Sequence, residues 1–401
     1  MRFELRLLSL LVAGVACGVY GACSATTVTS AAPPVDADAG AGEAGPALPA
    51  LAMNDVSVLV PLPASPTAPG YLKASSAGAR GKLLPQAVYD KVPEFPVVPP
   101  DGLDYALMRA VAIRFDGCFP APLSATRCEA QIRIVMQPFT TGGATLDSSL
   151  HLFYRLTEEE LAAVVVGLRE LKALAPETND GPLDVNPALL AQGMEGAYGV
   201  GLRDLVLAHA GEQNLTRMTF FLRAPPKQEE WFFGGFSREG ETMTPLTIVG
   251  VGKGNQRVDR PITTEGYEYS FTPAPKKPED LQLLLVTATA KTAAAADLQQ
   301  ALGAVARIEN PAKHGPDQLD CAGCHVATVL SAHAKANLAL DVTAHADAFK
   351  STRDLTVRGK SGTTPSSLRA FGYFGKEPMI ATRVVNETAA VLDDLETRFP
   401  R

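Results

Sequence analysis

The sequence predicts an α+β fold, with an antiparallel, β-rich domain that includes helices over residues 55–278 and a small all-α module over residues 279–401. Two observations predict it. Before residue 280, apolar and polar residues alternate in several short runs, as in half-buried strands. After residue 290, apolar residues recur every three or four positions, as in amphipathic helices. About 350 residues follow the N-terminal segment, which favours two domains.

The first half contains the clearest strand patterns. Three runs have alternating apolar positions, namely Val111, Ile113 and Phe115, then Ile132, Ile134 and Met136, then Leu150, Leu152 and Tyr154. His151 falls on the opposite face of the third run, where we expect a solvent-facing or structural side chain. Further strands are expected at Met218–Leu222, Trp231–Phe236, Leu246–Val251 and Tyr267–Phe271. The aromatic group Trp231, Phe232, Phe233 and Phe236 is expected to belong to the core, with a ligand groove as the alternative.

Helices are predicted from N-terminal capping residues and from apolar residues that recur along one side of a helix. Thr157 with Glu160 matches a capping box, and the apolar stripe that follows ends before Pro176. In the second half, Lys291 to Ile308 is rich in alanine and predicts a helix. A last amphipathic helix is expected from the stripe Val385, Thr388, Leu392, Leu395 and Phe399.

The N-terminus resembles that of an exported lipoprotein. Residues 1–22 have two arginines, an apolar run and then small residues, as in a signal peptide, and residues 23–54 predict a disordered tether. Cys17 and Cys23 both follow small residues, as at a lipidation site. Cys23 is favoured, because Cys17 then leaves with the signal peptide, Cys118 and Cys128 are expected to pair as a disulfide, and Cys321 and Cys324 belong to the motif described below. Lipidation at Cys17 would leave Cys23 without a role. Cleavage without lipidation is the alternative.

Composition excludes some functions. The net charge is −7 and no basic block is present, so nucleic-acid binding has no support. After the N-terminal segment no apolar run approaches 18 residues. Membrane attachment is therefore expected only through an N-terminal lipid anchor, and the protein is expected in the periplasm or at the outer membrane.

The segment Cys321-Ala322-Gly323-Cys324-His325 is the most informative motif. Two thiols at this spacing can form thioethers with the vinyl groups of one haem, and the adjacent histidine can bind the iron. The segment resembles the haem-attachment site of c-type cytochromes, over roughly the last 90 residues. The resemblance implies covalent haem c at Cys321 and Cys324 and iron ligation by His325. A zinc site would need a second ligand pair that the sequence lacks, while a Cys321–Cys324 disulfide remains an alternative.

The resemblance also implies a sixth iron ligand. Met379 stands where that family places its distal methionine, before the last helix, and is the preferred ligand. His345, His314 and an open or water-ligated iron position are the alternatives. Six bases and one acid lie between Lys350 and Lys376. They are expected to be a docking face for an acidic redox partner, to neutralise haem propionates or to form a solvated loop.

These observations predict a monohaem c-type cytochrome that carries one electron to and from an unknown redox partner protein. Two other classes remain open. One is a haem enzyme or sensor with an open sixth iron position, and the other is a structural envelope lipoprotein without haem. The sequence assigns no chemical role to residues 55–278.

Overall fold

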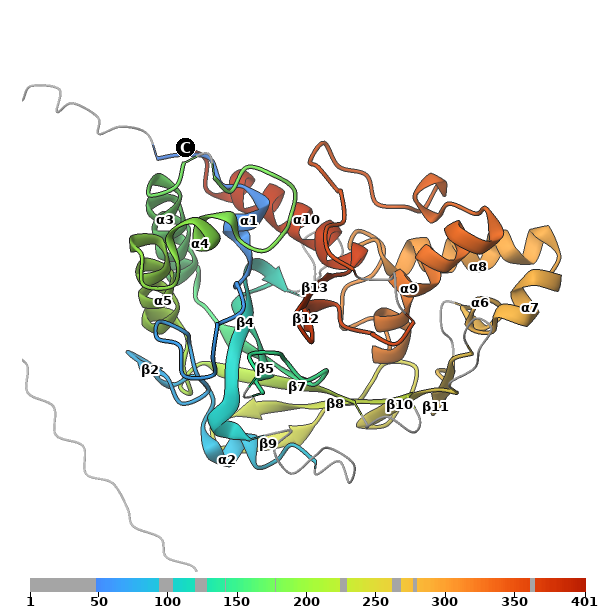
Figure 1. Ribbon diagram of the computed structural model, residues 1–401, viewed down its shortest axis with the longest axis horizontal. Helices are drawn as coiled ribbons and strands as arrows, with labels where there is room; N and C mark the ends of the chain where they lie inside the picture. Colours follow the sequence, from blue (N-terminus) through green and yellow to red (C-terminus); the bar gives the residue numbers. More distant parts are fainter. Residues whose placement is uncertain are drawn as a thin grey trace, which may run out of the picture. The chain divides into compact units, whose positions relative to one another are not determined.

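A nine-stranded antiparallel sheet dominates the computed structural model, which describes residues 48–93, 104–119, 128–140, 142–176, 178–223, 229–261, 268–276, 280–360 and 365–401. The strand order is β1-β4-β5-β6-β7-β8-β10-β11, and β9 pairs with β8 (Figure 1). The strands are β1 (Ser57–Leu59), β4 (Met108–Phe119), β5 (Glu129–Pro138), β6 (Ser149–Arg155), β7 (Leu215–Arg223), β8 (Glu229–Glu239), β9 (Thr242–Pro245), β10 (Asn255–Arg260) and β11 (Ser270–Thr272).

Alternation along the central strands gives the sheet two different faces. In β5 and β6, Ile134 pairs with Leu152, and both are fully buried. Their chain neighbours Val135 and His151 pair with each other and point to the opposite side. The same strands therefore support two separate layers of structure.

The first face is covered by helices from the first half of the chain. These are α1 (Met53–Val56), α3 (Glu158–Ala173), α4 (Pro187–Gln192) and α5 (Ala197–His209). Helix α3 begins with the predicted capping box, in which Thr157 Oγ1 accepts from Glu160 N and Glu160 Oε2 accepts from Thr157 N. Smaller elements at this end are β2 (Ala77–Gly78), β3 (Gly81–Lys82), α2 (Gln86–Tyr89) and η1 (Tyr105–Leu107).

Elements from the last third of the chain build the second side. The sheet is contacted by α9 (Cys321–Leu338), by the hairpin of β12 (Phe371–Phe374) and β13 (Glu377–Ile380), and by α10 (Thr382–Arg398). Four further elements, α6 (Gln282–Leu285), α7 (Thr287–Thr292), α8 (Ala295–Ile308) and η2 (Val342–Ala344), pack against α9 or against one another. Helix α10 and the hairpin lie on the opposite side of β4 from α3, α4 and α5 (Figure 1). Helix α9 packs on β8 and β10.

The predicted fold class is wrong, because residues 279–401 do not form a small all-α module. They contain the β12–β13 hairpin, and they complete a mixed fold that the antiparallel sheet dominates. Residues 47–401 form one compact unit. Helix α10 packs its apolar side on β4, and Thr388 Oγ1 contacts Ser57 Oγ at 2.8 Å. An amphipathic stripe predicts a buried helix side but not its partner, which here is the sheet.

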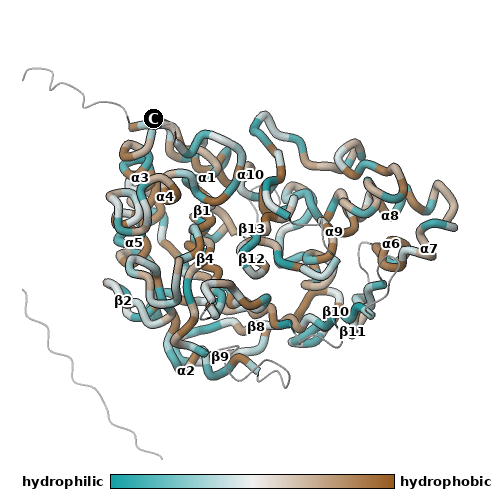
Figure 2. The backbone as a smooth tube through the Cα atoms, viewed as in Figure 1, coloured by the Kyte–Doolittle hydropathy of each residue, from teal (hydrophilic) through white to brown (hydrophobic). Residues whose placement is uncertain are grey.

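Two apolar cores fill the layers. The larger joins the central strands to α3, α5 and α10, and the smaller joins the β7, β8 and β10 end of the sheet to α6, α8 and α9. Along β4 the chain is largely hydrophobic (Figure 2). In the described part of the chain, no helix is both long and apolar enough to cross a membrane.

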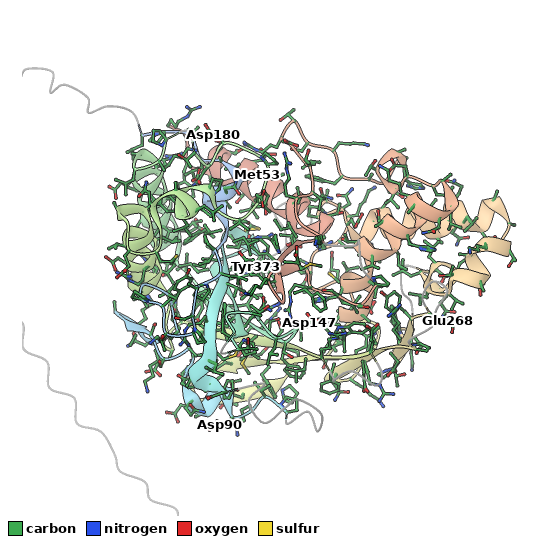
Figure 3. All side chains as sticks on the ribbon, in the orientation of Figure 1. Met53, Asp90, Asp147, Asp180, Glu268 and Tyr373 are labelled. Atoms are coloured by element: carbon green, nitrogen blue, oxygen red, sulfur yellow. A yellow bond between two sulfur atoms is a disulfide. The ribbon has the colours of Figure 1, made fainter. Side chains whose placement is uncertain are left out.

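The β12–β13 hairpin is fixed to the sheet by one buried amide. Gln137 on β5 accepts from Tyr373 N at 2.7 Å and donates to Tyr373 O at 2.9 Å. The Tyr373 hydroxyl donates to Val60 O at 2.8 Å, so its side chain is also bound (Figure 3). Gly375, with φ of 64°, lies in the turn between the two strands, where glycine adopts this conformation without strain.

Candidate functional site

The cysteine and histidine motif lies on the first turns of α9. Asp320 is the N-cap, and its Oδ2 accepts from Gly323 N at 2.8 Å. Gln256, fully buried on β10, donates to the same carboxylate at 3.0 Å and accepts from Ala322 N at 2.9 Å. Two polar side chains therefore hold the start of α9 against the sheet.

Helical geometry turns both thiols the same way. Cys321 and Cys324 are three residues apart, so they share one side of α9, and neither is in a disulfide. Both line a cavity of about 220 Å³ between α9, the second face of the sheet and α10. His325 lines the same cavity. All three predicted attachment residues therefore meet in one space.

The ring of His325 is fixed in one tautomer. Its Nδ1 lies 2.7 Å from Leu368 O, and because a carbonyl oxygen only accepts, Nδ1 carries the proton. Burial lowers the pKa of His325 to about 4, the bond to Leu368 acts in the opposite direction, and the charge of Arg369 lowers the pKa further. The neutral ring therefore keeps a lone pair on Nε2 at neutral pH, as a metal-binding histidine does.

Aromatic side chains from the sheet pack on this ring. Phe221 of β7 stacks on His325 with a centroid distance of 5.3 Å, and Phe233 of β8 lies at 4.8 Å. Phe233 lines the cavity, whereas Trp231 is fully buried in the smaller core. Phe232 and Phe236 pack against the larger core. Of the four aromatic residues singled out in the sequence, one therefore reaches the cavity.

The thiols are not set up as reactive thiolates. Burial raises the pKa of Cys321 to about 12, and the nearby carboxylate of Asp320 acts in the same direction. Burial also raises the pKa of Cys324 to about 11. Both stay protonated at neutral pH, unlike the thiolate of a disulfide oxidoreductase. Among the residues that the structure describes, no cluster of three or more His, Cys, Asp or Glu side chains is arranged to hold a metal ion.

Positive charge dominates the remaining wall of the cavity. Two acids line it, Asp320 and Glu387, together with four arginines, Arg114, Arg133, Arg217 and Arg383. Glu387 on α10 contacts Arg114 Nη1 at 2.5 Å and Arg383 Nε at 2.8 Å. Burial acts to raise the pKa of Glu387, but the surrounding arginine charges outweigh it and hold the pKa at about 2. The cavity thus has more cationic than anionic groups and suits a ligand with negative charge.

His151 lines the cavity, and the sequence did not predict these surroundings. Its position opposite Leu150 and Leu152 is as predicted, but it is half-buried and faces the cavity instead of solvent. Burial lowers the pKa of His151 to about 3, and the charges of His325 and Arg369 lower it further. The alternation in β6 identified the face, and only the fold reveals that α9 and α10 cover it.

The predicted distal ligands do not reach the cavity. Met379 is buried in β13, and His345 packs against Gly303 of α8 and accepts from Asp347 N at 3.1 Å. Neither is among the described residues that line the cavity. His314 meets α10 through its backbone carbonyl, which accepts from Arg383 at 2.7 Å. Their assignment as iron ligands stays a prediction.

Other predicted residues fall elsewhere. Cys118, in β4, and Cys128, just before β5, are joined by a disulfide of 2.11 Å. The signal peptide over residues 1–22, Cys23 and the tether as far as residue 47 lie outside the described residues, and Met53, within the predicted tether, begins α1.

In the basic stretch, Arg369 is buried and pairs with Asp147 at 3.1 Å, and Arg353 pairs with Asp393 and Glu396 of α10. Asp147 lies just before β6 (Figure 3). These two arginines therefore have structural partners within the fold.

Comparison of the chain with models of protein families, with curated proteins and with solved structures finds no match in any of the three.

Proposed function

We propose that this protein is a monohaem c-type cytochrome that carries one electron, with its haem in the cavity between α9 and the sheet. The observation that carries the proposal is the meeting of Cys321, Cys324 and His325 in one cavity. The bond from His325 Nδ1 to Leu368 O adds support, because it leaves Nε2 to bind iron.

The surrounding residues fit haem in their chemistry. The two thiols share one helix side, as two thioether bonds require. The arginines on the wall, with Arg133 and Arg217 on the sheet, match the negative charge of haem propionates. The space of about 220 Å³ is smaller than a haem, so attachment would require Phe221 and Phe233 to move away from His325.

When bound, haem supplies the Fe(III)/Fe(II) couple. The chain's own residues would fix the ring covalently, orient the imidazole and surround the iron with apolar and aromatic groups, which sets the reduction potential. Carrying an electron needs no bond-making step. An exported lipoprotein anchored at Cys23, in the periplasm or at the outer membrane, would meet its redox partner there.

Covalent attachment tests the proposal. The full chain is exported in cells competent for cytochrome c maturation, and a denaturing gel is stained for haem. Wild type is expected to stain and to gain the mass of one haem. Cys321→Ala/Cys324→Ala is expected to lose all stain. Lys335→Ala, an exposed position on the same helix, is the matched control and keeps it.

A colourless wild type, exported and folded, would reject the proposal. The structural lipoprotein would then be the better description.

A further inference from the structure

His151 reaches the cavity from the sheet, and His325 reaches it from a helix. His151 lies on β6, and its neighbours Leu150 and Leu152 are fully buried in the larger core, so the strand turns its side chain to the second face. His325 comes from α9. Within the described part of the chain, these are the two histidines that line the cavity.

Strand register places the two rings near each other. His151 pairs with Thr219, and Ser149 pairs with Phe221, whose ring stacks on His325 at 5.3 Å. His151 is therefore one diagonal step along the sheet from the residue that touches His325. Both rings line the same cavity, and both cysteines line it from α9.

Polar neighbours hold the position of His151 without enclosing it. Its Nε2 lies 3.2 Å from Ser149 Oγ, and Ser149 in turn accepts a hydrogen bond from Arg369, which is ion-paired with Asp147. A distance of 3.2 Å lies at the long end of the hydrogen-bond range. Binding of a metal by Nε2 would replace this one contact.

We infer that His151 is the sixth ligand of the haem iron, so that two histidines, one from the helix and one from the sheet, bind the metal from opposite sides. The inference rests on the proposed function. His151 replaces Met379 as the proposed sixth ligand, because Met379 lies in β13 and is not among the described residues that line the cavity. It also gives the large sheet a direct part in the haem site.

Spectroscopy of the exported holoprotein tests the inference. The oxidised wild type is expected to be low-spin, with the electron paramagnetic resonance signal of bis-imidazole ligation and no thioether-to-iron charge-transfer band. His151→Ala is expected to lose the low-spin signal, and added imidazole is expected to restore it. Met379→Leu and His345→Gln are matched controls and are expected to keep the wild-type spectrum.

The wild-type spectrum gives an answer even where His151→Ala fails to fold. High-spin iron in wild type, or a thioether band that Met379→Leu removes, would overturn the inference while haem staining upholds the cytochrome. An unchanged low-spin signal in His151→Ala would overturn it as well. A colourless wild type rejects both proposals. His151→Met is expected to create the thioether band and raise the reduction potential.

Discussion

The two faces of the sheet are built from alternate residues of the same strands, yet they have different chemistry. The face toward α3 and α5 is apolar and closely packed, with Ile134, Leu152 and Tyr154 fully buried. The face toward α9 and α10 contributes His151, Arg114, Arg133 and Arg217 to a cavity that the two helices complete with His325, Arg383 and Glu387. The first face is a closely packed core, whereas the second gives up close packing to provide a cavity with buried ion pairs in its wall. The predictions below test this division.

The largest expected loss of unfolding free energy comes from a substitution on the cavity side, at Glu387 of α10. Glu387→Gln removes the carboxylate that holds Arg114 and Arg383, and leaves buried positive charges near one another. Breaking a buried ion pair of this kind destabilises by about 3–5 kcal/mol. Urea unfolding of the exported protein measures the loss. Asp393→Asn, on the exposed side of α10, is the control and is expected to change stability by less than about 1 kcal/mol.

Substitutions at two adjacent residues of β6 allow the two faces of the sheet to be compared directly. Leu152→Ala leaves a hole in the packed core and is expected to lower the free energy of unfolding by about 2–5 kcal/mol. His151→Ala, one position earlier but facing the cavity, is expected to lower it by about 1 kcal/mol in protein without haem. Equal losses in the two variants would contradict the division between the faces.

A buried carboxyl on the site side predicts a pH dependence. Burial raises the pKa of Glu309 to about 7, although the hydroxyl of Thr328 donates to it at 2.9 Å and acts in the opposite direction. The folded state therefore holds this proton more tightly than the unfolded chain. Its contribution to stability is complete below pH 4.5 and is lost as the pH rises to about 7, on the order of 3 kcal/mol.

Comparison with Glu309→Gln isolates that contribution. Chemical unfolding at several pH values between 4 and 8 gives the difference in stability between variant and wild type, and other titrating groups contribute equally to both proteins. We expect the variant to gain relative stability as the pH rises. A constant difference would show that the carboxyl titrates alike in the folded and unfolded chains.

The smallest expected effect lies on the packed side. Thr157→Ala removes the cap of α3 and is expected to lower the unfolding free energy by about 1 kcal/mol, without changing haem attachment. Thr157→Ser keeps the hydroxyl and is expected to restore stability. Thermal unfolding together with the haem stain checks both statements. Loss of haem in Thr157→Ala would mean that the two faces are coupled.

Local patterns predicted the packed side well. The alternations at Val111–Phe115, Ile132–Met136 and Leu150–Tyr154 lie within β4, β5 and β6, and the capping box begins α3. Each depends on interactions between residues close in sequence, which is why periodicity and capping reveal them.

Elements whose burial is set by distant partners were missed. Leu246–Val251 has the apolar character of a strand, but it contains a turn in which Gly250 has a φ of 72°. The strand in this part of the chain is instead β10, a mostly polar segment that follows the turn. Its alternate residues Gln256 and Val258 are fully buried. Gln256 is buried because it holds the start of α9, a partner 64 residues away along the chain.

The candidate site was predicted in part for the same reason. Cys321, Cys324 and His325 are contiguous, so the motif was visible in the sequence. The carbonyl of Leu368 that orients His325, the arginines of β4 and β5, and His151 are brought to it only by folding.

The contact between Ser57 and Thr388 joins residues 331 positions apart. Ser57 begins β1, and Thr388 lies on α10, whose first turns also line the cavity. The sheet and the cavity are therefore not separable by truncation: a chain that ends before α10 would expose part of β4 and lose one wall of the cavity at the same time.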